Sequence, residues 1–70
     1  MSLLKKWKME VGDLIKHISS ERVALILGIY HLRVKGNNKK YARLLFSRES
    51  YVTEAPYDIL QVRWEVISAR

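Results

Sequence analysis

Apolar side chains recur at a helical spacing over the first eighteen positions of the chain. Plotted at about 100° per residue, they fall within an arc of about 120°. Ser2 is suited to cap the first turn, because a serine oxygen can accept one of its unpaired N–H groups. The pattern predicts an amphipathic helix over residues 3–18, whose apolar stripe consists of Leu3, Leu4, Trp7, Val11, Leu14, Ile15 and Ile18.

This stripe fits two environments. With basic residues on its polar face and Trp7 as an interfacial anchor, such a helix could lie on a membrane surface. A helix that packs on a protein core has the same apolar stripe, and we favour that environment. The longest apolar run, residues 23–30, is far short of the roughly 20 residues of a membrane-spanning helix. We therefore expect no membrane partner.

Beyond Ser20 the apolar pattern becomes that of strands. Two apolar runs, residues 23–34 and residues 41–46, have the length and the Val, Ile, Leu and aromatic content of strands. Between them lie residues that tolerate positive φ, namely Gly36, Asn37 and Asn38. The sequence therefore predicts a β-hairpin.

The clearest alternation of apolar and polar residues lies near the C-terminus, and it predicts a third strand with apolar positions Leu60, Val62, Trp64 and Val66. Residues 48–58 contain Pro56 and three acids, and we expect a loop there, with a short extended piece over residues 51–53. No repeat or linker divides the chain. The predicted fold is a single α+β domain over residues 1–70, with the N-terminal helix packed on one face of a three-stranded antiparallel meander (α-β-β-β).

The length of the hairpin loop decides which side chains share a face, because successive side chains of a strand alternate. An even loop leaves neither face wholly apolar, so we expect an odd loop of three or five residues. Arg33, Tyr41 and Arg43 then lie together on an open face, joined by Arg63 from the third strand. The opposite face is wholly apolar and receives the helix through Tyr30, Leu32, Val34, Ala42, Leu44 and Phe46.

Positive charge is concentrated in the first two thirds of the chain. Thirteen Lys and Arg against seven Asp and Glu give a net charge of +6, and residues 22–48 contain seven basic residues and no acidic one. This distribution favours an anionic partner, above all nucleic acid. The side chains expected to contact it are Arg33, Lys35, Lys39, Lys40 and Arg43 at phosphates, with Tyr41 for stacking and Arg63 nearby. Alternatively, the hairpin charges only discourage strand-edge pairing.

The root of the predicted open face is apolar and favours a protein partner. Its exposed side chains would be Leu25, Leu27, Ile29 and Leu45. Tyr51 and Tyr57, which flank Pro56 in the acidic segment, are further candidate contacts. A chain of 70 residues buries only about 60% of its unfolded surface. A homodimer or a host protein complex would therefore stabilise it.

No constellation of residues predicts catalysis, a metal or a cofactor. The chain has no cysteine, which excludes disulfides, thiolate zinc sites and cysteine nucleophiles. His17 and His31 have no carboxylate pattern around them. The three glycines are isolated, so no phosphate loop is predicted, and Gly28 is expected to allow either a bulge or close packing in the strand. No export signal is visible at the N-terminus, so we expect a cytoplasmic protein.

The predicted hairpin resembles the central hairpin of RelE-type and HigB-type toxins through Ile29-Tyr30-His31-Leu32-Arg33 and Tyr41-Ala42-Arg43-Leu44-Leu45-Phe46. Those proteins are endoribonucleases that use basic and aromatic side chains on an open sheet. The chain departs from their pattern in having one predicted helix before the sheet rather than two. It also lacks a recognisable C-terminal catalytic strand. The resemblance implies a ribonuclease toxin as an alternative function.

Three functional hypotheses follow from the sequence. The one we favour is a non-enzymatic, dimeric nucleic-acid-binding module of the kind that phages and mobile elements encode. The second is a protein-interaction module, either an inhibitor or a small subunit of a larger complex. The third is the toxin that the hairpin resembles.

Overall fold

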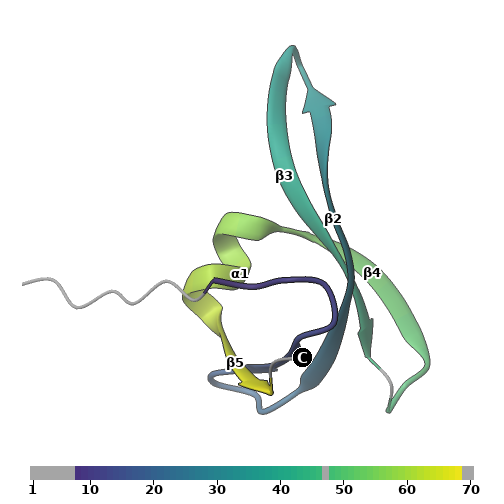
Figure 1. Cartoon of the computed structure of the whole chain (residues 1–70), viewed down its shortest axis with the longest axis vertical. Helices are drawn as coiled ribbons and strands as arrows, with labels where there is room; N and C mark the ends of the chain where they lie inside the picture. Colours follow the sequence, from purple (N-terminus) through teal and green to yellow (C-terminus); the bar gives the residue numbers. More distant parts are fainter. Residues whose placement is uncertain (1–7, 47, 69–70) are drawn as a thin grey trace, which may run out of the picture.

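Most of the described chain forms antiparallel strands. The computed structural model describes residues 8–46 and 48–68, and strands there form one sheet in the order β4-β3-β2-β1-β5 (Figure 1). Every neighbouring pair in this sheet is antiparallel. The elements are β1 (Leu14–His17), β2 (Val23–Val34), β3 (Asn37–Phe46), β4 (Tyr51–Pro56), α1 (Tyr57–Arg63) and β5 (Trp64–Ser68).

The predicted N-terminal helix is wrong over the described part of its range. A turn at Gly12, where φ is 97°, leads into β1. The apolar positions satisfy a strand instead, since Ile15 is buried while Leu14 points to the opposite face. The apolar residues on either side lie exposed in turns, namely Val11 and Ile18. The other predicted helix positions lie outside the described residues, namely Ser2, Leu3, Leu4 and Trp7.

The predicted third strand is divided between a helix and a strand. Leu60 and Val62 lie in α1, whereas Trp64 and Val66 lie in β5. Leu60 lies three residues after Tyr57, and this spacing buries both side chains on one face of α1. The alternation of apolar and polar residues that starts at Leu60 therefore did not mark a single strand. The first half of this apolar pattern belongs to a helix and the second half to a strand.

The acidic segment that was expected to be a loop forms the edge strand β4. Its pairing with β3 runs from Phe46↔Tyr51 to Tyr41↔Pro56, beyond the extended piece predicted for residues 51–53. Pro56 ends the strand and leads into α1, because its ring has no N–H to donate. Since the sheet has five strands and the helix is C-terminal, the predicted α-β-β-β fold class is wrong.

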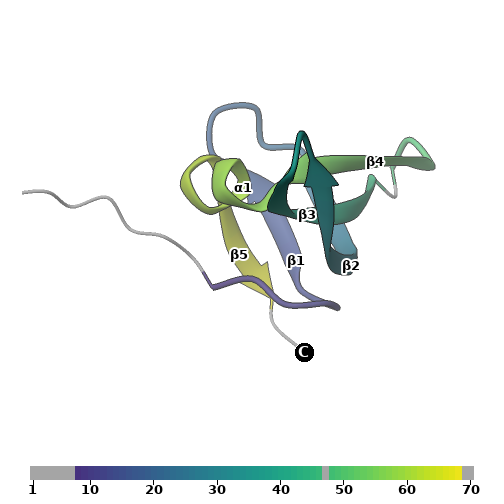
Figure 2. The ribbon, with the colours of Figure 1, turned by 90° about the horizontal axis from the view of Figure 1, so that it is seen from above.

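The sheet curls because α1 joins its two edge strands. The helix has seven residues and spans only about 10 Å, so β4 and β5 must approach each other (Figure 2). The core lies inside this curl, on what we call the core face. Its buried apolar side chains are Met9, Ile15, Ala24, Ile26, Ala42, Leu44, Phe46, Tyr57, Leu60 and Trp64.

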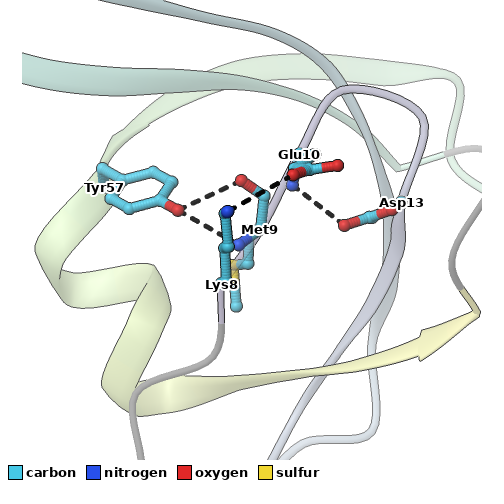
Figure 3. Close-up of polar contacts among 5 residues, drawn as sticks. All are labelled: Lys8, Met9, Glu10, Asp13 and Tyr57. Carbon is cyan, nitrogen blue, oxygen red and sulfur yellow. Dashed lines mark hydrogen bonds and ion pairs between the residues drawn. The ribbon is translucent and has the colours of Figure 1, made fainter.

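The segment before β1 is held to α1 by one tyrosine. The Tyr57 hydroxyl donates to the Met9 carbonyl at 3.0 Å and accepts the Met9 N–H at 3.0 Å (Figure 3). The buried Asp13 carboxylate accepts the Glu10 N–H at 2.9 Å, which shapes the turn that follows. These bonds place the Met9 side chain in the core, where it is 2% exposed.

The β2–β3 hairpin closes through a two-residue turn, so the expected odd loop is wrong. Val34 pairs with Asn37, and the turn residues Lys35 and Gly36 have φ of 51° and 81°. Two positive φ angles are typical of a type I′ turn, whose twist matches that of the flanking strands. The turn therefore consists of Lys35 and Gly36, whereas the sequence suggested Gly36, Asn37 and Asn38.

A β-bulge interrupts the long strand β2 at Gly28, which is one of the two features that the sequence predicted there. Ile26 pairs with Leu44, but the next pair is Gly28 with Arg43, so Leu27 is the additional residue. The additional residue shifts the alternation of side chains along β2 by one position. Ile26 and Ile29 both pack on the core face, although a regular strand would turn them to opposite faces.

Replacing Tyr57 by Phe tests the bond to Met9. The variant leaves the buried Met9 N–H without its acceptor, and we expect a loss of about 1–3 kcal/mol in the free energy of unfolding. Urea denaturation measures this change. Tyr51→Phe is the control, because that tyrosine is exposed and its hydroxyl has no hydrogen-bond partner among the described residues. Equal stabilities of the two variants would contradict the assignment.

Substitutions at Lys35 test the turn. Asn adopts positive φ more readily than Lys, so Lys35→Asn should raise the free energy of unfolding by up to about 1 kcal/mol. Lys35→Val removes the same charge but places a β-branched residue at positive φ, and it should lower stability. Thermal unfolding of the pair separates backbone strain from charge. If both variants shift the midpoint in the same direction, the turn conformation is not the cause.

Candidate nucleic-acid interface

The outer part of the β2–β3 hairpin projects from the body of the molecule as a two-stranded ribbon (Figure 1). Pairing of β2 with β1 ends at Leu25, and pairing of β3 with β4 ends at Tyr41. Beyond these points the described strands pair only with each other. Residues 31–40 are all exposed, and we call this segment the basic ribbon.

The basic ribbon carries cations on both faces and at its tip. Arg33 and Lys40 lie on the core face, Lys39 lies on the opposite face, and Lys35 is in the turn. Among the described residues, Arg33, Lys35 and Lys39 have no carboxylate partner. The ammonium of Lys40 lies 4.1 Å from the centroid of the Tyr57 ring, a cation–π distance. Three unpaired charges thus remain available to an anion.

The two-residue turn separates side chains that were expected to share a face. Tyr41 and Arg43 lie on the open face, which is the face opposite the core, whereas Arg33 lies on the core face. Tyr41 is instead directly opposite Tyr30. Sequence reasoning missed Tyr30, although an even loop would have placed it beside Tyr41.

Arg43 belongs to a polar cluster at the root of the ribbon. It lies opposite Glu54 in the register, with the guanidinium 4.0 Å from the carboxylate. The Tyr30 hydroxyl donates to the same carboxylate. Partial burial is the largest cause that raises the pKa of Tyr30 above its usual 10.0. The Glu54 carboxylate adds to this rise in pKa, whereas Arg43 opposes it. Tyr30 therefore remains a hydrogen-bond donor at neutral pH, and the charge of Arg43 is partly balanced.

The structure places Arg63 away from the basic ribbon. Its carbonyl accepts the Ile18 N–H at 3.0 Å, in the connection between β1 and β2. That connection lies at the end of β2 opposite the Lys35 turn. Arg63 also lines a hollow with His17 and Ser19, so it does not extend the charged surface of the ribbon.

Four apolar side chains form a row across the open face of the sheet. The register aligns them on β1, β2, β3 and β4, and we call them the apolar row: Leu14, Leu25, Leu45 and Val52. Val52 is 50% exposed, and Leu27, at the bulge beside the row, is 40% exposed. The other predicted partner contacts lie elsewhere. Ile29 faces the core, Tyr57 is buried, and Tyr51 stacks on Phe46 with ring centroids 5.8 Å apart.

Comparisons with known proteins assign the chain to no family. No protein-family model, curated protein or solved structure gave a significant match. The resemblance to the toxin hairpin therefore rests on residues 29–33 and 41–46 alone. In the described structure a strand, β1, precedes that hairpin, where the resemblance implied helices.

The described residues contain neither a metal cluster nor a helix suited to a bilayer. No three His, Asp or Glu side chains among them lie close enough together to hold a metal ion. Of the same residues, none belongs to a helix with the length and apolar character that a membrane crossing requires.

Proposed function

We propose that this protein is a non-enzymatic nucleic-acid-binding module that acts in the cytoplasm and binds through the basic ribbon. The observation that supports this function is a projecting ribbon in which Arg33, Lys35 and Lys39 have no carboxylate partner among the described residues. Residues 22–48 contain no acidic side chain that would repel a phosphate. Contacts between cations and phosphates supply most of the affinity of such modules.

The placement of the cations suits a groove better than a flat surface. A groove has phosphates along both walls, and the ribbon has Lys39 on one face and Arg33 on the other. The major groove of B-DNA is about 12 Å wide and admits a two-stranded β-ribbon. In this arrangement Lys35, at the tip, enters first.

The salt dependence of binding tests the proposal. Phosphate contacts by the three cations that have no carboxylate partner would give a slope of about −3 in a plot of log K against log salt concentration. Fluorescence anisotropy with a labelled duplex of about 20 base pairs measures this slope. An affinity that hardly changes between low and moderate salt would contradict phosphate binding by the ribbon.

A matched pair of arginine variants locates the contact. Arg33→Ala should reduce the slope by about 1 and weaken binding to every duplex alike. Arg48→Ala is the control, because it makes the same change at an exposed arginine beyond the opposite end of β3. The control should bind as the unchanged protein does. Equal effects of both variants would mean that the net charge, not the ribbon, determines affinity.

The apolar row favours a second candidate function, association through the open face. An apolar row that contains exposed Val52 and lies beside exposed Leu27 is typical of a surface that is covered by a protein partner. We propose a second copy of the chain as that partner, with a host protein complex as the alternative.

Val52→Lys tests this second candidate. We expect the unchanged protein to sediment as a dimer at tens of micromolar and the variant to sediment as a monomer, because the ammonium would be desolvated in the interface. Val62→Lys introduces the same charge at an exposed valine of α1 and should leave the dimer intact. A monomeric unchanged protein would contradict dimerisation through this face.

A further inference from the structure

The bulge in β2 creates a hollow on the open face, at the root of the ribbon. The hollow has a volume of about 260 Å³ and is lined by Leu27, Gly28, Tyr30 and Arg43. We call it the bulge hollow. It lies between the apolar row and the basic ribbon, so a nucleic acid strand on the ribbon could reach it.

The hollow depends on the missing side chain of Gly28. A Cβ built at this position meets no heavy atom within 4 Å, and the backbone φ lies outside the left-handed region that favours glycine. The conformation of the strand therefore does not require a glycine here. What the glycine provides is an open space opposite Arg43.

The walls of the hollow suit a flat aromatic ligand. The Arg43 guanidinium lies 5.8 Å from the centroid of the Tyr30 ring, and both groups stack readily on planar rings. Leu27 supplies an apolar wall. At about 260 Å³, the space is smaller than the roughly 300–1,000 Å³ of sites that enclose drug-sized ligands. It is suited to one ring system.

The electrostatics favour a base over a phosphate. The Glu54 carboxylate lies beside Arg43 and accepts the Tyr30 hydroxyl, so a phosphate would meet a negative charge there. A carboxylate oxygen can instead accept an N–H from the edge of a base. We propose that the bulge hollow binds one unpaired nucleobase, stacked on Tyr30, of a strand whose phosphates contact the basic ribbon. This inference rests on the proposed nucleic-acid-binding function.

The distance between the two contacts sets the length of the probe. Lys39 shares the open face with the hollow and pairs with Leu32, which is four positions from Gly28 along β2, and this separation corresponds to about 13 Å. A strand that advances about 3.4 Å per nucleotide covers this distance in about four nucleotides. A single-stranded oligonucleotide of twelve or more nucleotides therefore reaches both sites.

Gly28→Val tests the hollow without removing a charge. The valine fills the space but is compatible with a strand, so thermal unfolding should be unchanged while affinity for a mixed-sequence 12-nucleotide single strand falls roughly 5- to 150-fold. Tyr30→Ala should have the same effect. Tyr30→Phe keeps the ring and should bind within about twofold of the unchanged protein. The salt slope should be the same in all three variants.

The outcomes distinguish this inference from the function on which it rests. In one outcome Arg33→Ala reduces the salt slope, but Gly28→Val and Tyr30→Ala bind the single strand as the unchanged protein does. The hollow then binds no base, and the nucleic-acid-binding function of the ribbon stands. If neither salt nor Arg33→Ala affects binding, the nucleic-acid function itself fails. A loss of affinity with Tyr30→Phe equal to that with Tyr30→Ala would also overturn the stacking role.

Discussion

The bulge at Leu27 and Gly28 is the constraint on which the rest of the structure depends. It allows one twelve-residue strand, β2, to serve as the floor of the core at one end and as a free ribbon at the other. Without the additional residue, the side chains beyond it would change faces, and Ile29 would leave the core. A bulge also increases the local twist and bends the strand, which suits the departure of the ribbon from the sheet.

The two-residue turn then determines how the charges are displayed. With Val34 opposite Asn37, each cation of β3 takes the face of the β2 residue that it opposes, so Lys40 shares the core face with Arg33 and Lys39 lies on the open face. A loop one residue longer would reverse the faces of the β3 side chains relative to β2. The positive φ of Lys35 is unfavourable for a residue with a side chain. The turn conformation is therefore stabilised by the pairing of β2 with β3 more than by the intrinsic φ preference of Lys35.

The hairpin, its basic character and the bulge at Gly28 could be predicted from the sequence, because each rests on a local signal. The fold class could not. The apolar spacing before Ser19 satisfies both a helix and a short strand, and only the burial of Ile15 between β2 and β5 decides between them. Tertiary packing commonly overrides local propensity in this way. The faces on which Arg33 and Tyr41 lie depend on the length of the turn. The sequence suggested an odd loop, whereas the observed turn has two residues.

The end of β4 explains why the unpaired charge lies where it does. Acidic residues of the last third of the chain reach basic ones across the strands, giving the pairs Arg22 with Glu49, Arg43 with Glu54 and Lys16 with Glu65. Such exposed pairs contribute little stability, but they balance the cations of the body. Pro56 ends β4 opposite Tyr41, and the next acidic residue, Asp58 in α1, lines a hollow with Lys39 and Lys40. The cations beyond that point have no acidic residue opposite them on a neighbouring strand because β4 stops there, and the same ending leaves the outer part of β3 paired only with β2.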